Sequence, residues 1–517
     1  MKKTVPPGIL PVAAIDRDSD TPLYRQLYEG YRDAIAERRL RAGQRLPSTR
    51  SLAAELRISR IPVLNAFDQL TAEGYFESRV GSGTFVARSL PEELSRAALR
   101  KADGNPMGRP GSRTISRLPS TLVRSSAQPW FQGPGAFSIG QPPVDRFPVK
   151  VWSALVARHS RTGDPGLLHY SQSMGLPDLR EQLAEYLRTS RGVRCEADQI
   201  MIVNGSQQAV DLAARVLLDK DSPVWLEDPG YFGARKALRM SGARIVPVPV
   251  DEEGLDVEAG IARSPRARAV FVTPSHQCPL GVTMSAARRL NLLDWARREG
   301  AWIIEDDYDS EYRFGNLPVP ALQGLDRDSR VIYIGTFTKM LFPALRLGYV
   351  VLPRDLVSPF STIRRGMDFF SPTFSQAVLA DFIREGHFER HIRRTRLLCH
   401  ERREALVAAL ARAFGSSVRV PGDAAGMFLT AEFPDGRDDQ AIGFRAAPLG
   451  VRALPLSECY DGRPRRRGLV LGYGGVRPAE METAVSLLRQ AYDAAEARPT
   501  RSPLREIGRR VAGDARD

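Results

Sequence analysis

From residue 137 onward, short apolar segments alternate with amphipathic segments of helical period. The strand-like segments are residues 200–203, 223–226, 244–250, 269–273, 302–305 and 331–335, and helices are expected between them, for example over 207–218 and 286–299. Such alternation indicates a mostly parallel sheet with helices on both faces. Ligands of these sheets bind beyond the carboxyl ends of the strands. The pattern therefore predicts one large α/β domain over residues 137–497.

The front of the chain has a different pattern. Apolar residues recur every four positions over residues 22–37, which predicts an amphipathic helix. Ser48 and Ser59 suit the N-caps of two further helices, the second of them over residues 60–73. Strand-like residues 75–80 and 84–87 then flank a glycine turn. Three helices followed by a β-hairpin indicate a winged helix-turn-helix within residues 1–88.

A winged helix-turn-helix implies contacts with DNA. The N-terminal residues of its recognition helix lie nearest the bases, where hydroxyls and guanidiniums suit phosphates or guanine edges. We expect such contacts from Ser48, Arg50, Ser59 and Arg60, and close approach of the wing at Gly81 and Gly83. Residues 1–136 hold 21 Lys/Arg against 13 Asp/Glu, within a chain of net charge +14. Double-stranded DNA is therefore the expected partner.

Between and beyond these domains the sequence lacks periodicity. Residues 89–136 are rich in Arg, Ser, Pro and Gly, which is typical of a flexible basic linker, and residues 498–517 are expected to form a polar tail. The sequence has no run of about 18 apolar residues, and its first residues lack the continuous apolar core that is typical of a signal peptide. Four scattered cysteines favour reduced thiols over disulfides or zinc. A cytoplasmic protein without a membrane span or a metal site is expected.

The residues of the front domain resemble a known family. Leu-Pro-Ser-Thr-Arg-Ser-Leu-Ala (46–53), Ile-Ser-Arg (58–60), Ala-Glu-Gly-Tyr (72–75) and Gly-Ser-Gly-Thr-Phe-Val (81–86) are similar to the GntR-type DNA-binding domain. That family usually has polar residues after Ser-Arg, where this chain has Ile61-Pro62. Proline is tolerated in a first helical turn. We therefore expect the fold to be kept and two phosphate or base contacts to be lost.

The motif from Gly335 to Tyr349 indicates the chemistry of the large domain. It places Lys339 between the hydroxyls of Thr336 and Thr338 and the guanidinium of Arg346. An amine beside an anion clamp suits an aldehyde cofactor that carries a phosphate, because the amine forms a Schiff base and the clamp holds the dianion. The alternative is an ordinary lysine on a loop after a strand.

Three other strand ends supply matching groups. Gly205-Ser206-Gln207 opens a helix, so its amides point toward an anion. Tyr231 suits stacking on a heteroaromatic ring. A buried carboxylate at Asp306 would keep a pyridine nitrogen protonated, and Tyr308 would hydrogen-bond the phenolic oxygen of the same ring.

This set resembles the fold-type I pyridoxal 5′-phosphate enzymes of the aspartate aminotransferase type over about residues 137–495. The resemblance implies that Lys339 is the Schiff-base lysine, that Asp306 and Tyr308 bind the ring, and that Tyr231 stacks on it. It implies a phosphate cup made of Ser206, Gln207, Thr336, Thr338 and Arg346. Tyr170 matches the tyrosine that such dimers lend to the neighbouring subunit's phosphate.

Two departures from that family concern activity. The usual Asn-Pro-x-Gly reads Cys278-Pro279-Leu280-Gly281, which replaces a strong hydrogen-bond donor with a weak one. Val470 stands where aminotransferases carry the arginine that binds the substrate α-carboxylate. Arg465, Arg466 and Arg467 are close in sequence, but a loop shift would be needed to bring one of them in.

A GntR-type winged helix joined to an aminotransferase-like domain is the architecture of the MocR family of bacterial transcription regulators, which the chain resembles over nearly its whole length. The resemblance implies a head-to-tail homodimer that holds pyridoxal phosphate and changes its DNA contacts when an effector engages it. Val470 favours pyridoxal phosphate itself as the signal, as in the PdxR branch, and an amino acid or taurine is the rival effector. Two alternatives are an active aminotransferase with a DNA-binding appendage and a repressor whose rear domain only dimerises.

Overall fold

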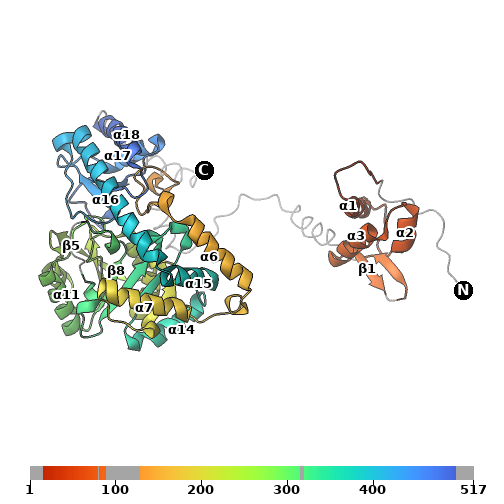
Figure 1. The fold of residues 1–517 in the computed structure, drawn as a ribbon, viewed down its shortest axis with the longest axis horizontal. Helices are drawn as coiled ribbons and strands as arrows, with labels where there is room; N and C mark the ends of the chain where they lie inside the picture. The colour runs from red at the N-terminus through yellow and green to blue at the C-terminus, as the bar shows by residue number, and fades with distance from the viewer. Residues whose placement is uncertain (1–14, 80, 89–127, 315–319, 497–517) are drawn as a thin grey trace, which may run out of the picture. The chain divides into compact units, whose positions relative to one another are not determined.

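The computed structural model describes residues 15–79, 81–88, 128–314 and 320–496, which fall into two compact units (Figure 1). The first unit consists of α1 (Leu23–Ala36), α2 (Thr49–Glu55), α3 (Arg60–Ala72), β1 (Phe76–Arg79) and β2 (Gly83–Val86). It confirms the predicted winged helix-turn-helix. Most of the predicted linker, residues 89–127, and the predicted tail lie outside the described residues.

An aromatic core holds the first unit together. The rings of Tyr31 on α1, Phe67 on α3 and Phe76 on β1 pack edge to face, with centroids 5.0–5.6 Å apart. All three side chains are buried. β1 pairs antiparallel with β2, with Phe76 opposite Val86. Helices and wing therefore share one core, which fixes the orientation of α3 within this unit.

The two predicted helix caps behave differently. The Ser48 hydroxyl accepts a hydrogen bond from the Ser51 amide at 3.1 Å, as expected of an N-cap. Ser59 occupies the predicted N-cap position of α3, but its side chain makes no capping hydrogen bond. Pro62 is the third helical residue, and it lacks the N–H that a capping hydroxyl would bind.

The second unit is built on an eight-stranded sheet of order β3-β10-β9-β8-β7-β4-β5-β6. β5, β4, β7, β8 and β9 are mutually parallel neighbours, whereas β10 runs antiparallel to both β3 and β9. The strands are β3 (Ile200–Val203), β4 (Pro223–Asp228), β5 (Arg244–Asp251), β6 (Gly254–Leu255), β7 (Ala269–Val272), β8 (Trp302–Asp307), β9 (Val331–Thr336) and β10 (Gly348–Val351). The predicted α/β fold is confirmed.

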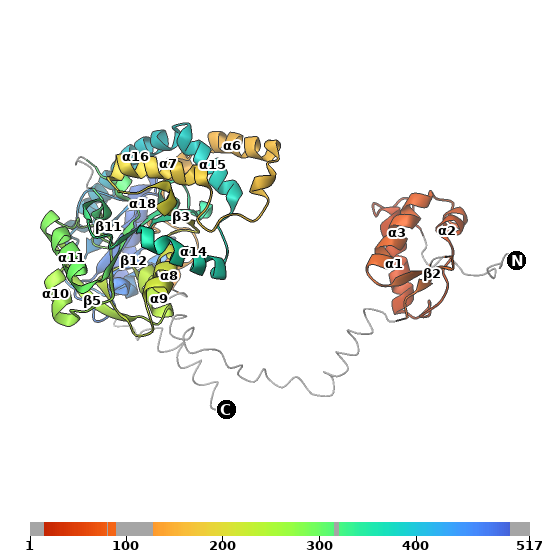
Figure 2. The same ribbon diagram turned by 90° about the horizontal axis from the view of Figure 1, so that it is seen from below.

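Helices cover both faces of this sheet (Figure 2). Ile200 and Ile202 of β3 belong to the apolar core formed with α7 and α15, whereas Met201 and Val203 belong to the core formed with α8, α9 and α14. The helices of this layered domain are α6 (Val149–Thr162), α7 (Pro177–Arg191), α8 (Ser206–Leu217), α9 (Phe232–Met240), α10 (Val257–Arg263), α11 (Ala286–Glu299), α12 (Leu322–Leu325), α13 (Phe337–Met340), α14 (Val357–Met367) and α15 (Thr373–Arg384).

A smaller subdomain completes the second unit. It has a three-stranded antiparallel sheet, and its elements are α16 (His387–Phe414), β11 (Phe428–Glu432), α17 (Asp439–Ala446), β12 (Leu454–Pro455), β13 (Gly468–Gly472) and α18 (Pro478–Glu496). Residues 128–136, assigned to the end of the linker from sequence, pack on this subdomain. Trp130 is buried there, with its ring 5.0 Å from that of Phe444.

In the part of the chain that the structure describes, no helix combines the length and apolar character needed to cross a membrane.

The end of β8 is held by a buried ion pair. Nε and Nη2 of Arg191 donate to Oδ2 of Asp307 at 2.9 and 2.7 Å, and the Tyr333 hydroxyl donates to the same oxygen at 2.7 Å. The side chains of Arg191 and Asp307 are only 3% and 1% exposed. The pair therefore fixes the strand end on which the candidate site is built.

We expect Arg191→Met to lower the free energy of unfolding of the large domain by about 3–5 kcal/mol, because it leaves the buried Asp307 charge without its cation. Urea denaturation followed by circular dichroism measures this change. The control is Arg194→Met, which alters an exposed arginine nearby and should stay within about 0.5 kcal/mol of the parent protein. Equal midpoints for the two variants would show that the ion pair does not hold the strand end.

Candidate cofactor site

A cavity of about 240 Å³ lies beyond the carboxyl ends of the parallel strands. It brings together five of the residues predicted from sequence: Ser206, Tyr231, Asp306, Tyr308 and Lys339. The remaining lining is largely apolar and includes Phe131, Ile139, Phe232, Met427, Phe428, Leu454 and Val470. The cavity thus combines one amine, one unpaired carboxylate and aromatic walls.

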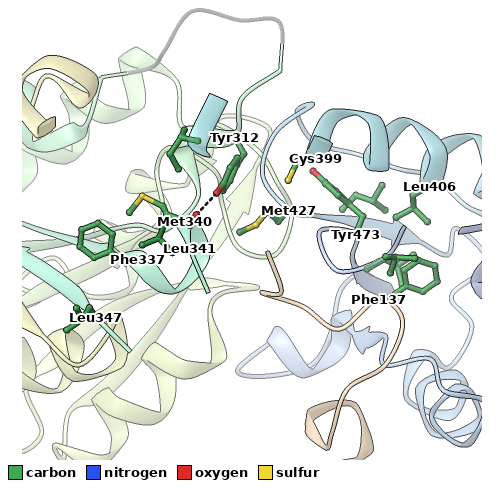
Figure 3. Close-up of a cluster of buried hydrophobic side chains, with 14 of the residues drawn as sticks. Phe137, Tyr312, Phe337, Met340, Leu341, Leu347, Cys399, Leu406, Met427 and Tyr473 are labelled. Carbon is green, nitrogen blue, oxygen red and sulfur yellow. Dashed lines mark hydrogen bonds between the residues drawn. The ribbon is translucent and has the colours of Figure 1, made fainter. Parts of the chain in front are cut away.

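The Lys339 turn is held rigidly by the core beneath it. Phe337, Met340 and Leu341, its neighbours in sequence, are buried in the core shown in Figure 3. The Tyr312 hydroxyl lies 3.3 Å from the carbonyl oxygens of both Lys339 and Met340. Because these anchors fix the backbone, the lysine side chain is directed into the cavity rather than into solvent.

The Lys339 amine is prepared to act as a nucleophile. Its Nζ donates a hydrogen bond to the Gly140 carbonyl at 3.0 Å. Burial lowers the pKa of this amine, against the opposing effect of Asp309 and Asp306. A lowered pKa increases the neutral fraction, which is the form that attacks an aldehyde.

Asp306 is a buried carboxylate with an unsatisfied oxygen. It is 3% exposed, and among the described residues its Oδ1 has no hydrogen-bond donor. Burial, together with the neighbouring Asp307, raises the pKa of Asp306 to about 8. A protonated ring nitrogen would supply the missing donor and charge. The donor set of this cavity therefore fits a pyridine cofactor.

An anion cup lies at the N-terminus of α8. Gly205 has φ of +87°, and a side chain there would meet the Arg346 guanidinium at 3.5 Å. Arg346 is anchored by donation from Nη2 to the Asn204 carbonyl at 3.0 Å. The buried Thr338 hydroxyl has no hydrogen-bond partner among the described residues. Guanidinium, hydroxyl and helix N-terminus together suit a phosphate.

Antiparallel β10 explains how Arg346 reaches the cup. Gly348 of β10 stands opposite both Val203, the last residue of β3, and Thr336, the last residue of β9. The N-terminal end of β10 therefore meets the carboxyl ends of its neighbours at one edge. Thr336 itself caps α13, since its hydroxyl accepts a hydrogen bond from the Thr338 amide at 3.2 Å.

Three predicted cofactor residues are placed otherwise in this structure. Nε2 of Gln207 donates to the Gly233 carbonyl at 2.9 Å, and Gln207 does not line the cavity. The Tyr308 hydroxyl lines it but donates to the His276 carbonyl at 2.7 Å, so its one proton is already engaged. Tyr170 is 87% exposed and lies beside the rings of Phe369 and Phe370, outside the cavity.

Other site residues were missed from sequence. Gly140 faces the Lys339 amine, and the only signal was the glycine and prolines of Ile139-Gly140-Gln141-Pro142-Pro143. The buried pair of His276 and Asp309, with Nδ1 3.1 Å from the carboxylate, stands beside Tyr308. Asp309 directly follows Tyr308 in the same strand-end segment from which Asp306 and Tyr308 are predicted, so the sequence did contain that signal.

The cavity wall at β13 carries no positive charge. Val470 is buried in the middle of β13, opposite Thr430 and Leu454. No arginine of the described chain lines the cavity. Arg466 instead contacts Glu432 at 3.1 Å, and Arg467 contacts Asp439 at 2.9 Å. The two arginines nearest in sequence to β13 are therefore engaged by carboxylates elsewhere.

The groups predicted to meet DNA are exposed on the first unit. Arg50 on α2 and Arg60 at the start of α3 are both exposed, and Nε of Arg60 donates to the Thr49 hydroxyl at 3.1 Å. The wing turn contains Gly81 and Gly83, with φ of +76° and +105°. Both glycines are exposed, which keeps the tip of the wing free of bulky side chains.

Both parts of the chain match known families. Residues 23–86 match bacterial regulatory proteins of the gntR family, and residues 136–442 match aminotransferase class I and II. The chain is 42% identical over 485 residues to the probable rhizopine catabolism regulatory protein MocR of Rhizobium meliloti, which covers 93% of this chain and 96% of that protein. The chain belongs to the MocR family of GntR-type transcription regulators.

Two further comparisons support the assignment to the MocR family. The HTH-type pyridoxine biosynthesis transcriptional regulator PdxR of Corynebacterium glutamicum is 30% identical, over 92% of this chain and 99% of that protein. The crystal structure of LysN, an alpha-aminoadipate aminotransferase from Thermus thermophilus, superposes with a TM-score of 0.66 at 29% identity and covers 77% of this chain and 99% of that one. The aminotransferase class I and II fold family depends on pyridoxal phosphate.

The raised pKa of Asp306 has a consequence for stability. An acid with a folded pKa of about 8 stabilises the fold at low pH and loses that contribution as pH rises through 8. We therefore expect Asp306→Asn to raise the melting temperature of cofactor-free protein at pH 8 by at least about 2 °C, since one pKa unit is worth about 1.4 kcal/mol. The same variant should bind pyridoxal phosphate more weakly.

Thermal melting between pH 5 and pH 8 measures the effect, and the exposed Asp328→Asn is the matched control. A variant less stable than the parent protein at pH 8 would contradict the assignment of Asp306 as an unpaired buried acid.

Proposed function

We propose that this transcription regulator holds pyridoxal 5′-phosphate covalently through Lys339 and uses its occupancy to control DNA binding. The observation that carries the proposal is the unpaired Oδ1 of Asp306 in the same cavity as the Lys339 amine. Bound pyridoxal phosphate supplies an aldehyde that an amine can capture and a ring that acts as an electron sink. Lys339 provides that amine, and Asp306 holds a proton on the ring nitrogen.

The other residues of the site position the cofactor. Arg346, Thr338 and the N-terminus of α8 at Ser206 hold the phosphate, with Thr336 supporting Thr338 and Gln207 bracing the adjoining Gly233 loop. The Tyr231 ring covers one face of the cofactor. Tyr308 would hydrogen-bond the phenolic oxygen of the cofactor if its hydroxyl gave up its present bond to the His276 carbonyl.

We further propose a head-to-tail homodimer. Tyr170 and Leu168 are 87% and 81% exposed, and Phe369 beside Tyr170 is 58% exposed. Aromatic and leucine side chains at such exposure mark a surface that a second copy would cover. In that arrangement Tyr170 serves the phosphate cup of the partner subunit. The two winged-helix domains of such a dimer then bind two operator half-sites. Each domain would contact DNA through Ser48, Arg50, Ser59, Arg60 and the wing at Gly81 and Gly83.

The effector we favour is pyridoxal phosphate itself. The wall at Val470 lacks a guanidinium, so the carboxylate of an amino acid finds no charged partner there. An effector shifts a regulator only if it binds its two arrangements unequally. Covalent capture at Lys339 in one arrangement, and not in the other, would meet that condition. The signal would then be the vitamin B6 supply.

An active aminotransferase is the second candidate function. The cavity keeps a buried lysine and the carboxylate that such an enzyme needs, and LysN is an aminotransferase of the same fold. Val470 argues against it, because a substrate amino acid would lack its bidentate partner. We therefore place transamination below sensing.

Borohydride reduction followed by peptide mass mapping tests the covalent link. We expect a pyridoxyl adduct on the Lys339 peptide of the parent protein, no adduct in Lys339→Ala, and a normal adduct in the control Lys236→Ala. Lys236 lies outside the cavity, over the rings of Phe131 and Phe232. Pyridoxal phosphate should change the DNA affinity of the parent protein but not of Lys339→Ala. An adduct on another lysine would leave the proposal without support.

The effector is tested with Arg465→Ala/Arg466→Ala. Because neither arginine lines the cavity, we expect this double variant to keep the full response of DNA affinity to pyridoxal phosphate. We expect amino acids to change the DNA affinity of neither the parent protein nor the double variant. Fluorescence anisotropy with operator DNA and visible absorbance of the cofactor provide the readouts. If an amino acid changes DNA binding in the parent protein and the double variant loses that response, the B6-sensor interpretation is wrong.

A further inference from the structure

The recognition helix α3 exposes two apolar side chains one turn apart. Ile61 in the first turn of α3 is 68% exposed, and Leu64 one turn later is 39% exposed. Neither belongs to the core, which α3 contacts through Val63, Ala66, Phe67 and Leu70. Ile61 and Leu64 together form a small exposed apolar surface on this helix, which a binding partner would remove from water.

The surroundings of Ile61 match a nucleic acid. The guanidiniums of Arg50 and Arg60 are exposed near it, and Arg60 is tied to Thr49 of α2. The first acidic residue of α3 is Asp68, about two turns further along the helix. Positive charge therefore flanks the apolar turn on the side that approaches DNA.

Pro62 keeps this turn rigid and frees a hydroxyl. Its ring fixes the backbone of the first turn, and its missing N–H leaves the Ser59 side chain without a capping bond. The Ser59 hydroxyl is exposed and available to a phosphate oxygen. Ile61 thus lies two residues after the Ser59 hydroxyl, in a first helical turn that Pro62 makes rigid.

We propose that Ile61 reads the 5-methyl group of a thymine in each operator half-site, with Leu64 extending the apolar contact. The thymine methyl is the apolar group that base edges present in the major groove. Asn65, exposed on the same face four residues after Ile61, lies about 6 Å further along the helix. It is placed to bind a neighbouring adenine. The inference rests on the DNA binding assigned above.

The test uses full-length protein loaded with pyridoxal phosphate. Duplexes are selected from random-sequence DNA, and each thymine of the best duplex is then replaced singly by uracil, which pairs alike but lacks the methyl. We expect one position in each half-site where uracil weakens binding about fourfold, the scale of one buried methyl group.

Three variants sharpen the test. Ile61→Ser should bind the thymine and uracil duplexes equally at that position, whereas Ile61→Val should keep most of the preference. The control Leu290→Ser changes a leucine on α11 that is 59% exposed, and it should behave as the parent protein does. Circular dichroism of each variant checks that the winged helix is folded.

The outcomes distinguish methyl recognition by Ile61 from DNA binding by the winged helix. If no thymine position responds to uracil, or if Ile61→Ser keeps the full response, the methyl-reading role of Ile61 is refuted while DNA binding stands. If no sequence is enriched from the library, both this inference and the proposed DNA-binding function are refuted.

Discussion

The site depends on how charge is balanced at the end of β8. Glu305, Asp307, Asp309 and Glu311 are buried, and each has a hydrogen-bond partner: backbone amides for Glu305, Arg191 for Asp307, His276 for Asp309 and Tyr186 for Glu311. Asp306, Asp307 and Glu311 each have one buried carboxylate oxygen without a hydrogen-bond partner among the described residues, and of these three Asp306 is the one that lines the cavity. Neighbouring negative charge and burial both disfavour the ionised form of Asp306, and a bound cation would stabilise that form. The fold thus places at Asp306 a carboxylate that a protonated cofactor ring would stabilise by charge and by a hydrogen bond.

Much of this arrangement was predictable from local sequence. The strand segments, the winged helix and the cluster of Asp306 with Lys339 follow from periodicity and from the rule that parallel strands end at one edge. β10 is not among the strands predicted from sequence, and its direction was not predictable, since four apolar residues carry no sign of antiparallel pairing. The Tyr308 bond to His276 depends on a turn from another strand, and the Gln207 bond depends on the Gly233 loop. Contacts between distant segments are what local patterns omit.

The start of α3 shows how one residue, Pro62, affects both helix capping and the exposed surface. Proline at position 62 costs the helix its capping bond, yet it stiffens the same turn and leaves Ser59 exposed. The winged-helix core of Tyr31, Phe67 and Phe76 absorbs that loss, because it fixes α3 from its other face. A weaker helix start is therefore compatible with a well-placed reading surface.

The hydrogen bond from Lys339 to Gly140 has a consequence for communication along the chain. Gly140 lies at the end of residues 128–140, a described segment of the second unit that supplies Phe131 and Ile139 to the cavity wall. An amine committed to a covalent partner is no longer free to hold that carbonyl. Under the proposed function, capture of this nitrogen would break the hydrogen bond to Gly140 and so would act directly on residues 128–140, without a relay through the sheet.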